Sequence, residues 1–268
     1  INTGAEADLQ DIRFSGNVSS PEKAGGLVGE ADSVTVEKAR IETNVTNTGE
    51  NYLPGGVIGE ADRAVISHVR VNGSLVGVDG AGGFVGRGFG ALVEIEQSAG
   101  NFSLLEGSDT SEISGGVGGF VGAQISGIDI RVSNSLVNIA SIKVANGASH
   151  THPFVGKVGT NTAIAINDSF AVVDERQGTT DDGLDGDVAS NTVPGQDVVV
   201  DVYYNESADS STFGDGPVPS KNNITVLSRE SMRGEAAATN MDLDFGTTWR
   251  TTDGFPDLNL PAVPQLTF

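Results

Sequence analysis

The sequence predicts an all-β protein: a parallel β-solenoid (β-helix) of about six to seven coils that ends in a C-terminal capping segment. Three observations predict this class. A Gly-Gly motif returns in steps of about 30 residues, short strands rich in β-branched residues alternate apolar and polar positions beside it, and no helical period separates them. Because one such unit cannot bury its apolar side alone, stacked units are expected to share one continuous core.

The Gly-Gly motif marks a corner that every coil repeats. It occurs at 25–29, 55–59, 82–86 and 118–122, with a degenerate copy at 152–156. In that copy, His152 and Pro153 replace the two glycines. We expect the glycines to permit positive φ at the corners and to let adjacent coils approach where a Cβ would collide. The apolar residues after them should stack as a core ladder: Leu27, Val57, Phe84, Phe120 and Phe154.

Strand blocks recur between the corners. Apolar and polar residues alternate in them with a period of two, which is typical of a strand with one buried face. Ile12, Val69 and Ile130 should therefore point inward, and the arginines that follow them should point outward.

Three segments are expected along the chain: solenoid repeats over 1–173, an acidic connector loop over 174–197 and a capping segment over 198–268. In the last segment, a short helix should begin with Ser228 as its N-cap and end before Gly234. An open solenoid end exposes strand edges and core, so we expect an apolar cover over the last coil. Its expected members are Phe245, Trp249, Phe255 and Leu258.

The composition restricts the classes of partner that the protein can have. The formal net charge is -21, which disfavours nucleic acid because like charges repel, and there is no cysteine for disulfides or thiol catalysis. Molar salt shortens the Debye length to about 3 Å, so this acidity favours a halophilic source over an ordinary acidic surface protein. No apolar run is long enough for direct membrane insertion. The chain opens at Ile1 without a targeting signal, as expected of a mature or excised piece.

The repeat Gly-Gly-(Leu/Val/Phe)-(Val/Ile)-Gly resembles the GLUG-motif repeat family of large microbial surface proteins. The tail strengthens the resemblance through Tyr203-Tyr204, Trp249 and Pro256-Asp257-Leu258. The resemblance implies cell-surface display and adhesion, with the terminal Trp and Pro-x-Leu packed over the last coil. It implies no catalytic residues.

The connector contains a candidate cation site. Its four carboxylates are hard oxygen ligands that suit Ca²⁺ or another hard cation, although a solvated acidic loop is the alternative. The residues are Asp181, Asp182, Asp185 and Asp187. No other cofactor is expected. His150 and His152 could face one metal ion from a strand, but two ligands form a weaker candidate.

Arginines on the outward positions form a candidate ligand-binding ladder. Stacked guanidinium groups could bind the carboxylates or sulfates of an acidic glycan. The residues are Arg13, Arg40, Arg70 and Arg131. The alternative is that each pairs with a nearby acid such as Glu37, Glu42 or Asp129.

Asn-x-Ser/Thr sequons recur at similar places in successive repeats. They begin at Asn17, Asn44, Asn72, Asn101, Asn167, Asn205 and Asn223. They predict either a stripe of attached glycans on an exported glycoprotein or turn chemistry copied by duplication.

Together these features predict a non-enzymatic extracellular surface module, an adhesive or structural component of a cell-surface filament, fibre or large surface protein. Its expected partner is a cell-surface glycan or surface protein, or other copies of itself in a fibre. A viral receptor-binding fibre and a polysaccharide-active β-helix enzyme are the alternatives. Stacked carboxylates such as Glu30 and Glu60 would serve such an enzyme, but a ladder gives both the same environment, and acid/base pairs need different ones.

Overall fold

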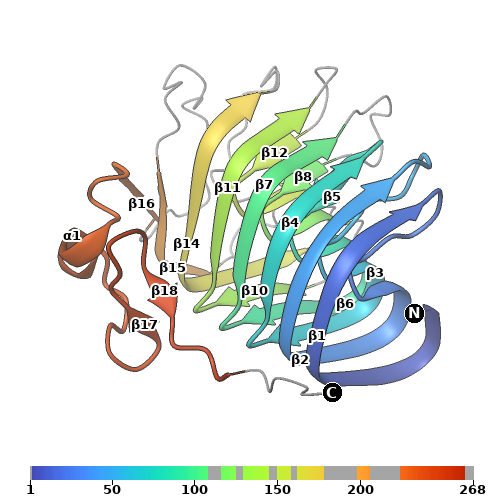
Figure 1. Ribbon diagram of the computed structural model, residues 1–268, viewed down its shortest axis with the longest axis horizontal. Helices are drawn as coiled ribbons and strands as arrows, with labels where there is room; N and C mark the ends of the chain where they lie inside the picture. Colours follow the sequence, from blue (N-terminus) through green and yellow to red (C-terminus); the bar gives the residue numbers. More distant parts are fainter. Residues whose placement is uncertain are drawn as a thin grey trace.

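The computed structural model describes residues 2–107, 116–124, 129–144, 150–157, 162–177, 198–205 and 224–262. Within them the chain forms a parallel β-solenoid of about five turns with one short helix, so the predicted fold class is confirmed (Figure 1). Among the described residues, no helix has the length and apolar character needed to cross a lipid bilayer.

The strands of the first coils are β1 (Asn2–Ser20), β2 (Val28–Asn47), β3 (Ile58–Ser67), β4 (Arg70–Gly77), β5 (Gly80–Gly82), β6 (Val85–Glu96), β7 (Ala99–Gly107), β8 (Gly116–Gly118) and β9 (Val121–Gln124). The later elements are β10 (Asp129–Ser133), β11 (Leu136–Val144), β12 (His150–His152), β13 (Val155–Lys157), β14 (Ala163–Gln177), β15 (Val198–Asn205), β16 (Ile224–Leu227), α1 (Gly234–Asn240), β17 (Trp249–Arg250) and β18 (Asp257–Leu258).

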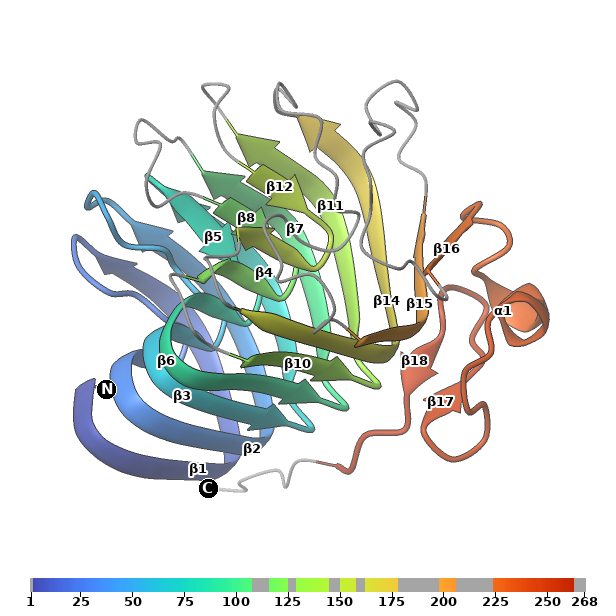
Figure 2. The same cartoon turned by 180° about the vertical axis from the view of Figure 1, so that it is seen from behind.

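The strands stack as three faces around one axis. The long strands β1, β2, β14 and β15 run through the first and second faces. Strands β3, β6, β9, β10 and β13 complete the first face, and β4, β7, β11 and β16 complete the second. The short strands β5, β8 and β12 form the third face (Figure 2). Because all these pairs are parallel, equivalent residues of successive coils form rows along the axis.

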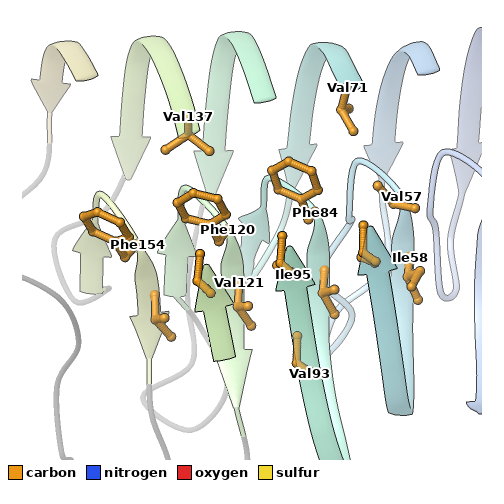
Figure 3. Packing of buried hydrophobic residues seen from close by; sticks show 14 of the residues in the cluster. Val57, Ile58, Val71, Phe84, Val93, Ile95, Phe120, Val121, Val137 and Phe154 are labelled. Carbon is orange, nitrogen blue, oxygen red and sulfur yellow. The ribbon is translucent and has the colours of Figure 1, made fainter. Parts of the chain in front are cut away.

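Apolar side chains of the coils meet in one continuous core. The predicted ladder is present: Val57, Phe84, Phe120 and Phe154 are fully buried, and Leu27 packs partly buried against the same cluster. Phe120 stacks between Phe84 and Phe154, with ring centroids 5.6 and 5.5 Å apart (Figure 3). The three coils that carry a phenylalanine at this position therefore bury their rings against one another.

Close backbone approach explains the glycines of the Gly-Gly corner. A Cβ on Gly56 would lie 2.1 Å from the carbonyl oxygen of Gly83, and a Cβ on Gly83 would lie 1.9 Å from that of Gly119. The expectation of positive φ was wrong at these corners, because none of the motif glycines has it. The glycines are needed for space and not for a left-handed backbone.

A left-handed backbone does occur at a different corner, where the first face turns into the second. There each rung has one non-glycine residue with φ between 44° and 57°. The members are Asp11, Lys38, His68, Gln97, Asn134, Asp168 and Asp201. This corner occurs seven times among the described residues, which agrees with the expected six to seven coils. The number of complete turns that include all three faces is smaller, about five.

A serine ladder satisfies the buried backbone beside this corner. Ser98, Ser135 and Ser169 are fully buried. The Oγ of Ser98 accepts the N–H of Val69 at 3.1 Å, and the N–H groups of Ser98 and Ser135 each donate to the serine Oγ of the next rung at the same distance. The left-handed turn thus leaves no buried donor unpaired at these three positions.

The capping segment forms a second apolar cluster with the outer side of the last coils. Trp249 and Leu258 are buried there, Phe245 and Phe255 are partly buried, and Trp249 lies against Phe170 with ring centroids 5.3 Å apart. The expected residues therefore form an apolar cover, but it spreads along the outward-facing side of the second face, from Ala99 to Tyr203, whereas the prediction placed it over the last coil.

The helix of this segment does not begin at Ser228. The Ser228 hydroxyl accepts the N–H of Ser231 at 3.2 Å, which caps a turn, and Gly234 with φ of 56° ends that turn. Helix α1 begins at Gly234, where an alanine run with high helix propensity follows. The prediction placed the helix one turn too early because it treated Gly234 as a terminator.

The solenoid sheet continues past the expected boundary at Val173. Strand β14 runs through this position, and β15 and β16 add two further rungs to the second face. Most of the expected connector, 178–197, lies outside the described residues.

Candidate functional site

One outward row on the second face changes character along the solenoid. Register pairs place Arg13 beside Arg40, Arg40 beside Arg70, and Arg70 beside Ala99. The row then continues with Leu136, Phe170 and Tyr203. We call this series the outer row. Its first three rungs are cationic, and its last four are apolar and covered by the capping segment.

The structure brings three of the four predicted arginines together and places the fourth elsewhere. Arg131 lies on the first face, in register with Glu94 of β6. In this coil, Leu136 holds the position equivalent to Arg70, five residues after Arg131. The match of the Ile-Arg dipeptide was therefore out of register with the strands of the second face.

Each arginine has a different ionic environment. Arg40 pairs with Glu42 at 2.9 Å, and Arg131 pairs with Asp129 at 3.3 Å, both exposed and both as the alternative interpretation expected. Glu37 instead pairs with Lys38, at 3.0 Å. Arg13 has no ion pair among the described residues.

Arg70 binds the C-terminal part of the capping segment. Its guanidinium lies 2.8 Å from a carboxylate oxygen of Asp257, which also pairs with Arg250. We call residues 250–262 the strap, because they run along the outer row from Trp249, which packs against Phe170 of β14, toward β1 (Figure 1). The contact between Arg70 and Asp257 joins positions 187 residues apart.

The double ion pair controls the ionisation of Asp257. Burial acts to raise the pKa of this carboxyl, but the hydrogen bonds from Arg250 and Arg70 outweigh burial, so its pKa lies below the usual range. Asp257 is therefore charged at neutral pH and holds the strap to β4.

A groove of about 280 Å³ lies between the strap and the cationic part of the outer row. Its polar lining comprises Arg13, Arg40, His68, Arg70 and Arg250. Its apolar lining comprises Ala39, Leu258, Leu260, Pro261 and Ala262. None of the described residues that line it is acidic. We call it the arginine groove.

A second groove of about 350 Å³ lies on the other side of the Arg70–Asp257 bridge. Amides line it in successive rungs: Asn72, Asn101 and Asn138. Asn138 donates to the Oδ1 of Asn101 at 3.0 Å. We call it the amide groove.

The predicted sequons fall into several environments. Asn17 and Asn44 are exposed neighbours joined by a 3.0 Å hydrogen bond, while Asn72 and Asn101 lie on another row, two positions earlier in the strands. Asn167 is half-buried at the end of the first face. Asn223 lies outside the described residues.

Asn205 has a different place in the structure. Its side chain is only 4% exposed, and its amide both accepts from the N–H of Val173 at 2.6 Å and donates to the carbonyl of Val173 at 2.8 Å. This pair of hydrogen bonds ties β15 to β14. The amide nitrogen, to which a glycan of this sequon would be attached, is therefore hydrogen-bonded inside the fold.

The candidate cation ligands Asp181, Asp182, Asp185 and Asp187 lie outside the described residues. Within the described ranges, no group of three His, Asp or Glu side chains is placed to hold a metal ion. His152 is buried at the Gly-Gly corner.

The stacked carboxylates of the sequence share one lysine. Glu30 and Glu60 are register partners, and Lys23 lies 2.5 Å from the first and 2.6 Å from the second. Burial lowers the pKa of Lys23, but its hydrogen bonds to both glutamates prevail and raise it. The row continues with buried Arg87, whose pKa burial lowers. The two carboxylates share Lys23, although Glu60 is the more buried of the two and lies beside Arg87.

Sequence reasoning did not find three residues of the arginine groove and its rim: His68, Arg250 and Asp257. His68 comes two residues before Arg70 and could have been found from the repeat. No sequence spacing links Arg250 or Asp257 to β4, because the strap reaches it from the far end of the chain.

The comparisons with known proteins assign no relative: no family model, no curated protein and no solved structure matches this chain.

Proposed function

We propose that this chain is a non-enzymatic, extracellular surface module of the GLUG-like repeat type, an adhesive component of a cell-surface filament, fibre or large surface protein from a halophile. The observation that carries the proposal is the outer side of the second face. There a continuously packed stack presents rows of arginine and asparagine beside two open grooves. A rigid scaffold with repeated polar groups suits binding to a repetitive surface.

The stacked glutamates support the non-enzymatic part of the proposal. A glycoside hydrolase needs two carboxylates with distinct protonation states, whereas Glu30 and Glu60 share one lysine. The repeats and the tail support the surface location through their likeness to surface proteins.

Size-exclusion chromatography of polysaccharides with the purified protein tests the function. Acidic and neutral chains are run in about 0.1 M and about 1 M NaCl, before and after incubation. Co-elution with chains of unchanged length is expected. Shortened chains would overturn the non-enzymatic assignment, and elution of every polysaccharide apart from the protein would overturn the adhesive one.

A further inference from the structure

We propose that the arginine groove is the binding site for the anionic groups of an acidic polysaccharide, a carboxylated or sulfated chain that lies along the solenoid axis. This inference rests on the proposed adhesive function and names the ligand class and the residues that bind it.

The first argument is the concentration of positive charge. Four of the chain's arginines line the groove, in a protein whose formal net charge is -21. The carboxylates paired with them are Glu42 and Asp257, fewer than the guanidinium groups. The stability of the fold does not require this surplus of arginines, because exposed arginines contribute little to stability even when they are paired.

The second argument is the unequal use of these arginines within the protein. Arg70 and Arg250 hold the strap through Asp257, which fixes the groove wall. Arg13 is exposed and has no ion pair among the described residues, and Arg40 keeps donors beyond its contact with Glu42. A guanidinium has five N–H donors in a planar fork that suits carboxylate or sulfate oxygens.

The third argument is the shape of the site. Neighbouring rungs lie about 4.8 Å apart, so Arg13 and Arg70 present charges about 10 Å apart along one line. A compact ion would contact one or two of these groups. A chain with regularly repeated anions contacts all three rungs, which favours a polymeric ligand.

The fourth argument separates a polysaccharide from other polyanions. The groove has an accessible apolar wall from Leu260, Pro261 and Ala262, which suits the C–H groups of a sugar. Beyond the Arg70–Asp257 bridge, the amide groove offers donors and acceptors that suit sugar hydroxyls. A nucleic acid would bring a far denser charge against the acidic surface.

Binding of dextran sulfate, polygalacturonate, polyglutamate and unmodified dextran to immobilised protein in about 0.1 M NaCl tests the site. The test variant is the double substitution Arg13→Gln and Arg40→Gln. The matched control is Arg131→Gln, which removes an exposed arginine with a similar ion pair from another face. Thermal melts confirm that both variants fold.

We expect the two acidic polysaccharides to bind, dextran not to bind, and the double variant to lose at least about tenfold in affinity, with the control within twofold of the original protein. Unchanged binding by the double variant, or an equal loss in the control, would overturn the groove assignment and leave adhesion intact. Equal, arginine-dependent binding of polyglutamate would overturn the polysaccharide assignment. No binding of any polysaccharide by the original protein would overturn the adhesive function as well.

Discussion

Asp168 lies at the left-handed corner, near three other aspartates. Burial, followed by the charges of Asp201, Asp242 and Asp244, raises the pKa of its carboxyl. A raised pKa means that the folded state disfavours the charged form. The charged carboxylate therefore destabilises the fold at neutral pH, and this penalty disappears as the pH falls through the raised value.

Replacing Asp168 by Asn should stabilise the protein at pH 7 by about 0.5 kcal/mol, because it removes like-charge repulsion without changing the shape of the side chain. Asparagine tolerates the left-handed backbone, and Asn134 already occupies the preceding rung. Urea denaturation followed by circular dichroism measures the gain. The gain should shrink in high salt and at low pH, and Asp32→Asn, at an exposed site, serves as the control. If the Asp168 variant were less stable than the original protein at pH 7, repulsion between the aspartates would not be a destabilising factor.

The two repeated corners differ in how far the sequence predicts them. The aromatic ladder was predictable, because Phe84, Phe120 and Phe154 each follow the same glycine-rich motif at the same offset. The left-handed corner was not, since Asp, Lys, His, Gln and Asn all occupy it. Its conformation is imposed by the turn between two faces and by the serine ladder, and not by one residue type.

At the scale of elements, the Gly-Gly corner sets the distance between coils. Gly56→Ala should destabilise the protein by at least about 3 kcal/mol or prevent folding, since its Cβ would meet the carbonyl oxygen of Gly83 and neither backbone can yield alone. Gly254→Ala is the control, because the nearest atom to its Cβ is 3.6 Å away, and it should change stability by less than about 0.5 kcal/mol. Urea midpoints compare the two. Similar midpoints would show that the coils can separate at this corner.

The strap depends on one carboxylate. Because the pKa of Asp257 is depressed in the folded state, its ion pairs contribute fully above the usual aspartate pKa of about 3.9 and are lost as the pH falls through the lower, folded value. Asp257→Asn should therefore increase hydrogen exchange in residues 250–262 at pH 7, while costing about 1 kcal/mol or less overall, as for other partly exposed ion pairs.

The original protein should show the same loosening of the strap only below about pH 4. Asp253→Asn, in an exposed position of the same segment, should leave exchange unchanged. Strap protection that persists in the Asp257 variant would assign the attachment to the apolar contacts of Leu258 instead.

Features that depend on neighbouring residues in the sequence were easier to predict than contacts between distant segments of the chain. The strand repeats, the apolar cover and three members of the arginine row follow from local spacing. The predicted position of Arg131 was wrong because the Ile-Arg dipeptide recurs on the first face of that coil, whereas Leu136 holds the position equivalent to Arg70. The groove wall could not be predicted, because Asp257 meets Arg70 only after the whole solenoid has formed.

For the whole molecule, the acidic surface and the arginine groove act over different distances. The Debye length is about 30 Å in 0.01 M salt, about 10 Å in 0.1 M and about 3 Å in 1 M. At the first value a polyanion is repelled by most of the net charge of -21, and at the second it mainly experiences the groove.

Affinity for dextran sulfate should therefore rise from about 0.01 M to about 0.1 M salt and fall again toward 1 M. Isothermal titration across this range measures it. Counterion release alone predicts that the affinity declines steadily from the lowest salt concentration. Such a decline would contradict the view that the acidic surface repels the polyanion while the groove attracts it. The Arg131→Gln variant should show the same maximum.

The strap also determines how the solenoid responds to mechanical load. The hydrogen bonds between rungs run along the axis, so tension in that direction opens the stack one rung at a time. The strap lies parallel to that axis, anchored to β14 through Trp249 and to β4 through Asp257. Rungs between these anchors can separate only after the strap detaches, so it acts as a tether that makes this part of the rod yield last.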